Sequence, residues 1–462
     1  MNFPYGKFNN KRIDKYMFKM ILDYLPELEW EKFKWNNKCK AAIQELTIVD
    51  DIEILATHGR IESIKNLPHP DLNLALEAAS LAGHFKIVEY VLEKGATDLD
   101  SALGEACEGG FRDIMDYLIS KGATNWDVGL AGACGGGHQD LAEKMIELGA
   151  KDIEFGLHYA CYGGQAHMIN FMIEKGAHDY YYAMIGAIDG GCMSSVYILI
   201  EKGFDNWNLG LIVACTFGNI QIADYMMNRG AINYNWALNA ACCGGNIDLI
   251  NLIIEKGAND WNEGLCGACR SDNKQIAENM ITRGANNFIK ALNMACTHNH
   301  IDLSKFLIDL GTINANMSLV LACLSKSTDL IDYTIKKGAN RLDNGLISAA
   351  STGNLPIIKH MINLGANNFD EGLIETCKYG HLEVAKFLIQ KGATNYNSAL
   401  LTASAFNHCN LVTLLLDIGA DDLNTSLSTA CFKNHQDLAN ILIQRGACYC
   451  DNCDNQNHQI NV

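Results

Sequence analysis

Hydrophobic and polar positions repeat every 27 residues along most of the chain. Glycines fall at this interval from Gly95 to Gly446, fourteen in all, without an insertion or a deletion. Each interval contains two hydrophobic stripes with helical spacing. In the interval that ends at Gly149 they are Leu130, Ala133 and Cys134, followed by Leu141, Met145 and Ile146. A period of this length predicts a solenoid of stacked helix pairs instead of several globular domains.

Polar residues and glycines in fixed columns predict where the helices begin and end. The column of Asp127 holds mostly Asp, Asn or Glu, so we expect the first helix of that repeat to take Asp127 as its N-cap. The column of Gly137 holds Gly or Asn nearly everywhere, which predicts a left-handed C-cap. Asp272 and Lys326 depart from that column.

The repeat resembles the ankyrin motif. The segment from Gly380 to Ala393, Gly-His-Leu-Glu-Val-Ala-Lys-Phe-Leu-Ile-Gln-Lys-Gly-Ala, is very similar to the second helix and turn of that motif. An ankyrin repeat has about 33 residues, and the roughly six that are missing here fall where the family carries its β-hairpin. The resemblance therefore implies an all-α, ankyrin-like solenoid of stacked helix-turn-helix repeats with shortened hairpin loops. Shortened tandem repeats with Asn-rich loops are also similar to the ankyrin arrays of giant DNA viruses of amoebae (mimivirus-like).

The pattern divides the chain into three parts. Residues 44–446 form the repeat array, with about fifteen repeats of which the first is degenerate. Residues 1–43 are expected to form a helical N-terminal cap over the apolar face of the array. Their hydrophobic spacing from Ile21 to Trp35 is also similar to an F-box, which implies an adaptor that recruits a Skp1-type ubiquitin-ligase component. Residues 447–462 form a Cys-rich C-terminal tail.

Charge and hydropathy narrow the choice of partners. The 462 residues carry a net charge of −17, which disfavours binding to nucleic acid. No apolar run reaches the ~18–20 residues of a membrane-spanning helix, and the N-terminal segment lacks the apolar core of a signal peptide. We therefore expect a cytoplasmic protein, in the host cell cytoplasm if the source is viral, with no membrane or nucleic-acid partner.

The 18 cysteines suggest chemistry, but packing explains most of them. Ten occupy one column of the first helix, where Ser, Ile and Ala replace them in other repeats, so we expect buried, unbridged thiols. The Cys-x3-His pattern, as at Cys134 and His138, is not expected to be catalytic because Asn replaces the histidine in many repeats. No phosphate-binding loop and no recurring pair of carboxylates is present, so we expect neither enzyme activity nor a cofactor in the array.

The C-terminal tail holds a different cysteine pattern. Cys448, Cys450, Cys453 and His458 lie outside the column, in the order Cys-x-Cys-x2-Cys-x4-His. Zinc prefers four nitrogen or sulfur ligands, and the Cys-x2-Cys-x4-His part resembles most of a zinc knuckle. Two interpretations stay open: a zinc site, and a polar tail with incidental cysteines.

A protein partner is expected on the concave face that ankyrin arrays build from their first helices. One early first-helix column holds Trp, Glu and Lys in succession, so it is not a core column. Apolar and aromatic residues fill it in five consecutive repeats, and such side chains are typical of binding hot spots. With two neighbouring tyrosines, the candidate residues are Val128, Phe155, Tyr181, Tyr182, Leu209, Tyr234 and Trp236. The alternative is that the shortened loops bury these side chains against the next repeat.

Three functions are open at this point. The first is a protein–protein interaction scaffold, and the second is the F-box-like adaptor, which differs from the first only in residues 1–43. The third is a structural spacer without a dedicated ligand, which a surface lacking any apolar patch would favour.

Overall fold

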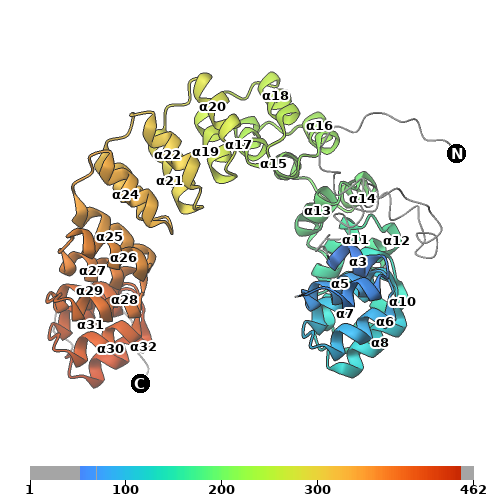
Figure 1. The fold of residues 1–462 in the computed structure, drawn as a ribbon, viewed down its shortest axis with the longest axis horizontal. Helices are drawn as coiled ribbons and strands as arrows, with labels where there is room; N and C mark the ends of the chain where they lie inside the picture. Colours follow the sequence, from blue (N-terminus) through green and yellow to red (C-terminus); the bar gives the residue numbers. More distant parts are fainter. Residues whose placement is uncertain (1–51, 69, 449–462) are drawn as a thin grey trace. The chain divides into compact units, whose positions relative to one another are not determined.

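Every regular element in the described part of the chain is an α-helix. The computed structural model describes residues 52–68 and 70–448, and Figure 1 shows its helices in chain order. These residues contain 30 helices, α3 to α32, and no strand. The expected all-α class is therefore confirmed. Residues 1–43 lie outside the described residues, so the cap and the F-box-like segment stay predictions.

The chain divides into two units, Met1–Ile232 and Asn233–Val462. In the first unit, α3 (Ile52–Thr57) and α4 (Ile61–Lys65) form the first described pair. The first helices of the following pairs are α5 (Leu72–Leu81), α7 (Leu99–Gly109), α9 (Trp126–Gly136), α11 (Ile153–Tyr162), α13 (Tyr180–Asp189) and α15 (Trp207–Phe217). Their second helices are α6 (Phe85–Glu93), α8 (Arg112–Lys121), α10 (Gln139–Leu148), α12 (Ala166–Glu174), α14 (Met193–Glu201) and α16 (Ile220–Asn228). First helices pack on the first helices of neighbouring pairs, so this unit has a first-helix layer and a second-helix layer.

The second unit is built in the same way. Its first helices are α17 (Tyr234–Gly244), α19 (Trp261–Arg270), α21 (Phe288–Thr297), α23 (Ala315–Ala322), α25 (Leu342–Thr352), α27 (Phe369–Tyr379), α29 (Tyr396–Ala405) and α31 (Leu423–Phe432). Its second helices are α18 (Ile247–Glu255), α20 (Lys274–Thr282), α22 (Ile301–Asp309), α24 (Thr328–Lys336), α26 (Leu355–Leu364), α28 (Leu382–Gln390), α30 (Cys409–Asp417) and α32 (Gln436–Gln444). Here too each first helix packs on the next first helix along the chain.

The first helices begin earlier than the sequence pattern indicated. Asn125 is the N-cap of α9, and its side-chain oxygen accepts a hydrogen bond from the Val128 N–H at 3.4 Å. The prediction that Asp127 is the N-cap is therefore wrong. Its carboxylate instead accepts hydrogen bonds from the backbone N–H groups of Lys151 and Asp152 in the next repeat, at 2.6 and 2.8 Å.

This bridge between repeats recurs in both units, and the short loop explains it. A backbone N–H in a shortened loop has no hairpin partner, and leaving it unpaired is costly. A side-chain oxygen of the preceding first helix takes the place of that partner. The same bond from the next loop is accepted by Asp100, Glu154, Asn208, Asn235, Asn262, Asn316, Asp343, Asp370 and Asn397.

We expect Asp127→Ala to lower the free energy of unfolding by about 1–2 kcal/mol, because two backbone N–H groups lose a charged acceptor. Asp127→Asn should cost less than about 0.5 kcal/mol, since asparagine makes the same bonds at Asn235. Urea unfolding of the three proteins measures both effects. Equal losses for the alanine and asparagine variants would show that the bridge contributes nothing.

The predicted left-handed helix ends are confirmed. Gly137 has a φ of 85°, which a side chain would strain. Within residues 52–68 and 70–448, the non-glycine residues with positive φ all belong to this column: Asn299 (63°), Asn407 (61°), Asn434 (60°) and Asp272 (60°). Asn and Asp visit this region more readily than other residues, so these helix ends keep the same turn without glycine.

Small residues bring the backbones of α7 and α9 into direct contact. A Cβ atom added at Gly132 would lie 2.0 Å from the carbonyl oxygen of Gly104, and one at Gly136 would lie 2.0 Å from that of Glu108. Both distances are far below van der Waals contact, so only glycine fits at these two positions. The two helices therefore pack closer than helices with larger side chains between them.

The cysteine column packs as the sequence predicted. Nine of its ten cysteines are buried, and Cys431 is partly buried. Burial raises the pKa of the Cys134 thiol to about 12, so the thiolate is disfavoured. Its Sγ contacts Met172 Sδ at 3.4 Å. These cysteines act as small core residues.

Histidine and asparagine form different hydrogen bonds at the start of the second helix. The His84 and His381 rings donate from Nε2 to carbonyl oxygens of the preceding repeat, Thr57 O at 2.9 Å and Ser351 O at 3.0 Å. Asn219 instead caps its own helix. These two histidines thus have a structural role, joining one repeat to the one before it.

The segment 299–338 is the most degenerate part of the repeat pattern. Its first helix, α23, has eight residues, and the buried hydroxyl group of Thr334 on α24 stands in a column that holds Val, Leu, Met or Ile in the other repeats. Because solenoid stability is a sum of local terms, we expect the amides of α23 and α24 to exchange with deuterium before those of α25–α28. Hydrogen exchange followed by mass spectrometry tests this, and slower exchange in α23 than in α27 would contradict it.

Candidate partner-binding face

Partly exposed side chains line one face of the first helices in the first unit. In α11 they are Phe155, His158, Tyr159 and Tyr162, at the spacing of a single helical face. The same positions hold Ser101, Gly104, Glu105 and Glu108 in α7, Val128, Ala131, Gly132 and Gly135 in α9, and Tyr182, Ile185, Gly186 and Asp189 in α13. We refer to these four sets together as the first-helix stripe.

The aromatic rings of the stripe contact one another across two repeats. Phe155 and Tyr159 form an edge-to-face pair with ring centroids 4.8 Å apart. The His158 and Tyr182 rings stack at 4.3 Å, and His158 Nδ1 donates to Tyr182 O at 3.0 Å. Tyr162, at the end of α11, is 43% exposed. These contacts hold the rings in place before any partner binds.

The structure brings only some of the predicted residues into this stripe. Val128, Phe155 and Tyr182 belong to it, and Leu209 holds the equivalent, partly buried position of α15. Tyr181 lies beside the stripe, where its Oη donates to Asp205 at 3.1 Å and its ring contacts buried Phe204. Val128 packs against Gly104 of the preceding repeat, which is partly the burial that the alternative interpretation expected.

Two predicted residues belong to the second unit. Tyr234 is the first residue of α17 and is partly buried, whereas Trp236 is 61% exposed. In the following repeats of that unit the Trp236 column holds Glu263 and Lys290, which form an ion pair. The column therefore holds an aromatic residue in the first repeat of the second unit and charged residues in the next two repeats.

Glutamates share the first-helix stripe with these rings. Burial, followed by the charges of Glu108 and Glu77, raises the pKa of Glu105 to about 7. Burial also raises the pKa of Glu108, and it is the largest cause of the raised pKa of Glu77 on α5. The first helices α5 to α15 contain no Lys or Arg. The charges that act on an ionised Glu105 from its own layer are thus those of other carboxylates.

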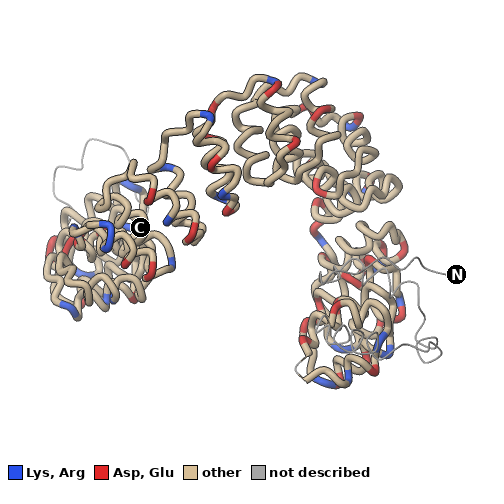
Figure 2. The backbone as a smooth tube through the Cα atoms, turned by 45° about the horizontal axis from the view of Figure 1, so that its top comes forward, with Lys and Arg blue, Asp and Glu red and all other residues tan. Residues whose placement is uncertain are grey.

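Between residues 70 and 232, the positive charges of the first unit lie in its other layer. Figure 2 marks them along the chain. With the exception of Lys151 in a loop, they lie in the second helices or directly after them. From residue 70 to residue 232 they are Lys86, Lys94, Arg112, Lys121, Lys144, Lys151, Lys175, Lys202 and Arg229.

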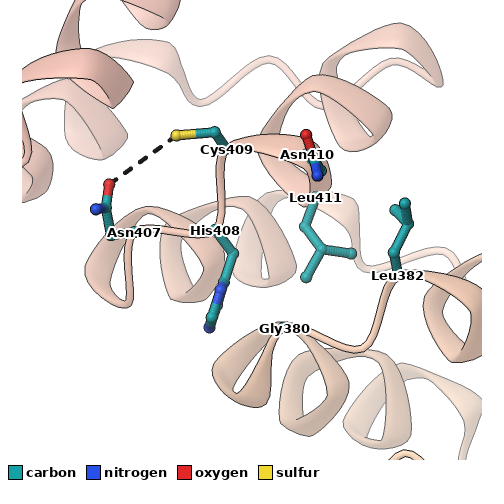
Figure 3. A pocket seen from close by; sticks show the side chains of 7 residues that line it. All are labelled: Gly380, Leu382, Asn407, His408, Cys409, Asn410 and Leu411. Atoms are coloured by element: carbon teal, nitrogen blue, oxygen red, sulfur yellow. Dashed lines mark hydrogen bonds between the residues drawn. The ribbon is translucent and has the colours of Figure 1, made fainter. Parts of the chain in front are cut away.

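A pocket of about 290 Å³ lies elsewhere, between two turns of the second unit. Figure 3 shows its lining, which is Gly380, Leu382, Asn407, His408, Cys409, Asn410 and Leu411. His408 Nε2 already donates to Lys378 O at 3.1 Å. Cys409 Sγ lies 4.0 Å from Asn407 Oδ1. The pocket is thus a gap between repeat turns whose histidine already has a structural partner.

The predicted zinc ligands fall mostly beyond the described chain. Cys448 is exposed, and its backbone N–H donates to Asn424 Oδ1 at 2.8 Å. Cys450, Cys453 and His458 lie outside the described residues. Within residues 52–68 and 70–448, no group of three or more His, Cys, Asp or Glu side chains is placed to hold a metal ion. The zinc site stays a prediction.

Comparison with known proteins supports the repeat assignment. A family model of ankyrin repeats (three copies) matches residues 346–425 and 373–454, in the second unit. Helix pairs of the same order fill the rest of the described chain, and the fold is an ankyrin-like helical solenoid. No curated protein matches the sequence. None of the helices among the described residues combines the length and apolar character that crossing a membrane requires.

The sequence alone did not identify Glu105, Glu108, His158, Tyr159 or Tyr162 as parts of this face. Their columns vary between repeats, so no repeating pattern marks them. One signal was available, which is the complete lack of Lys and Arg from six consecutive first helices.

Proposed function

We propose that this protein is an interaction scaffold that binds a protein partner on the face formed by its first helices. Ankyrin repeats generally mediate protein–protein interaction, and their match to residues 346–454 makes this class the best supported. The observation that carries the proposal is the first-helix stripe, whose ordered aromatic rings stay partly exposed. Rigid aromatic side chains of this kind are typical of binding hot spots.

Exposed apolar side chains favour a scaffold over a spacer without a ligand. Tyr162, Tyr181 and Phe217 in the first unit are each 43–47% exposed, and Trp236 in the second unit is 61% exposed. Such side chains gain free energy when a partner covers them. The buried thiol column supports a reducing compartment such as the cytoplasm, where we place the scaffold.

The test compares Phe155→Ala and Trp236→Ala, each in the full chain, in affinity capture followed by quantitative mass spectrometry. We expect each variant to lose at least about tenfold of the captured partner, as hot-spot truncation does. Trp236→Ala should leave the melting temperature nearly unchanged, because the side chain is mostly exposed.

Tyr197→Ala is the matched control. Tyr197 is 46% exposed and lies on α14, in the second-helix layer. The Tyr197→Ala variant should retain the captured partner. Retention by Phe155→Ala, or an equal loss with Tyr197→Ala, would contradict binding on the first-helix face.

A further inference from the structure

We infer that the first-helix stripe binds a partner segment carrying Lys or Arg side chains opposite Glu105 and Glu108 and an apolar side chain opposite the rings of α11. The inference rests on the proposed scaffold function and names the chemistry of the partner. It follows from three observations. They are the arrangement of α7, α9 and α11, the separation of charge between the two layers, and the aromatic rings of the stripe, which take part in none of the described cation–π pairs.

The glutamates and the aromatic rings lie on either side of a helix with a very small surface. Val128, Ala131, Gly132 and Gly135 are the stripe residues of α9, and none is larger than valine. Gly132 packs directly against the backbone of α7, while a Cβ atom added at Gly135 would lie within 4 Å of Tyr159 on α11. No long side chain of α9 therefore separates Glu105 from Tyr159, and one extended segment can contact both.

Charge complementarity identifies the partner as cationic. Glu105 and Glu108 are partly buried on a layer without Lys or Arg, so their ionised forms have no positive side chain from the first helices to offset them. A carboxylate whose water is displaced by a partner is stable only if a cation or hydrogen-bond donor replaces the water. An acidic segment would leave both carboxylates without compensation, and a neutral segment could offer them hydrogen bonds but no opposite charge, so both kinds of segment are disfavoured relative to a cationic one.

The aromatic rings of the stripe are available for the same segment. Within the first unit, the described cation–π pairs involve Tyr90, Tyr117, Phe171 and Trp207, and none of these residues belongs to the stripe. Phe155 and Tyr159 can therefore receive a guanidinium, an ammonium or an apolar side chain from outside. Carboxylates and rings together favour Arg, which forms both bidentate ion pairs and ring stacking.

The test measures binding of fluorescein-labelled peptides to the full chain by fluorescence anisotropy, at 150 mM salt and pH 8. The three probes are (Gly-Arg-Ser-Leu)3, (Gly-Gln-Ser-Leu)3 and (Gly-Glu-Ser-Leu)3. We expect the Arg peptide to bind at least tenfold more tightly than the other two. Equal affinity for the Arg and Gln peptides, or tighter binding of the Glu peptide, would overturn the inference.

Matched variants separate a local site from the overall acidity of the chain. Glu105→Gln combined with Glu108→Gln should weaken Arg-peptide binding at least tenfold. Glu89→Gln combined with Asp116→Asn removes the same charge from exposed positions of α6 and α8, and it should change the affinity less than twofold because salt screens distant charges. Equal weakening by both pairs would overturn the inference in favour of diffuse attraction.

Two further readouts complete the test. A homodimer seen by light scattering, and dissolved by the Glu105 and Glu108 changes, would place a second copy on the stripe and overturn the inference. Loss of a captured partner with Phe155→Ala, but not with the glutamate pair, would also overturn it while leaving the scaffold function intact. If Phe155→Ala retains the partner, the scaffold proposal itself fails.

Discussion

Replacing Gly132 with alanine should lower the free energy of unfolding by about 3 kcal/mol or more, whereas Gly135→Ala on the same helix should raise it by about 0.5–1 kcal/mol. The added Cβ at Gly132 would lie 2.0 Å from the Gly104 carbonyl oxygen, so α9 must move away from α7. At Gly135 the nearest atoms, all of Tyr159, lie 3.7–3.9 Å away, which is ordinary contact. Only the gain in helix propensity then remains.

The two substituted glycines lie three residues apart in the same helix, so each variant is a control for the other. Urea unfolding of the full chain gives the change in stability. Hydrogen exchange of α7 and α9 shows whether the loss is local, as a solenoid requires. Changes of the same sign and size would contradict the backbone contact between α7 and α9.

The second large effect concerns the pH dependence of stability at Glu105. The pKa of this carboxyl is raised to about 7 in the folded protein, from an ordinary value of 4.5. Between these two values the folded chain binds a proton that the unfolded chain has lost, so stability falls as pH rises from about 4.5 to about 7. Because Glu105 is partly exposed, we expect a loss on the order of 1–2 kcal/mol.

Glu105→Gln should remove this loss and leave the free protein more stable than the wild type at pH 8. Urea unfolding of both proteins at several pH values measures the difference, which should be smallest near pH 4.5 and should level off above pH 7. A difference that does not change with pH would contradict the prediction. The same substitution should weaken Arg-peptide binding, so stability and binding are expected to oppose each other at this residue.

The sequence predicted the helix pairs and their C-terminal turns because those features depend on local chemistry. The left-handed turn needs Gly, Asn or Asp wherever it occurs, and the pattern found it even at Asn299 and Asn434. The N-cap was misplaced because cap-forming residues occur in two nearby columns, at Asn125 and at Asp127. Only the position of the following loop distinguishes them, and that position depends on packing between repeats.

The candidate face could be predicted only in part, for a related reason. An aromatic residue such as Phe155 or Trp236 in a variable column already indicates a surface. The partial burial of Glu105 does not show in its column, and Tyr181 was grouped with the face although its hydroxyl bonds to Asp205. These are three-dimensional relations between neighbouring repeats, which a column of residues does not contain.

Two recurring bridges between repeats, the loop bridge and the histidine bridge, share one direction along the array. Asp127 accepts bonds from the loop of the next repeat, and the His84 ring donates to the repeat before it, so in both cases the later repeat supplies the donors. A chain that emerges from the ribosome builds the acceptors first, and each new repeat can complete its bonds on arrival. Deleting a repeat from one end of the array is therefore not equivalent to deleting one from the other end. Loss of the earlier neighbour leaves the loop N–H groups of the next repeat without their acceptor. Loss of the later neighbour leaves, at this bridge, only a side-chain acceptor that water can solvate.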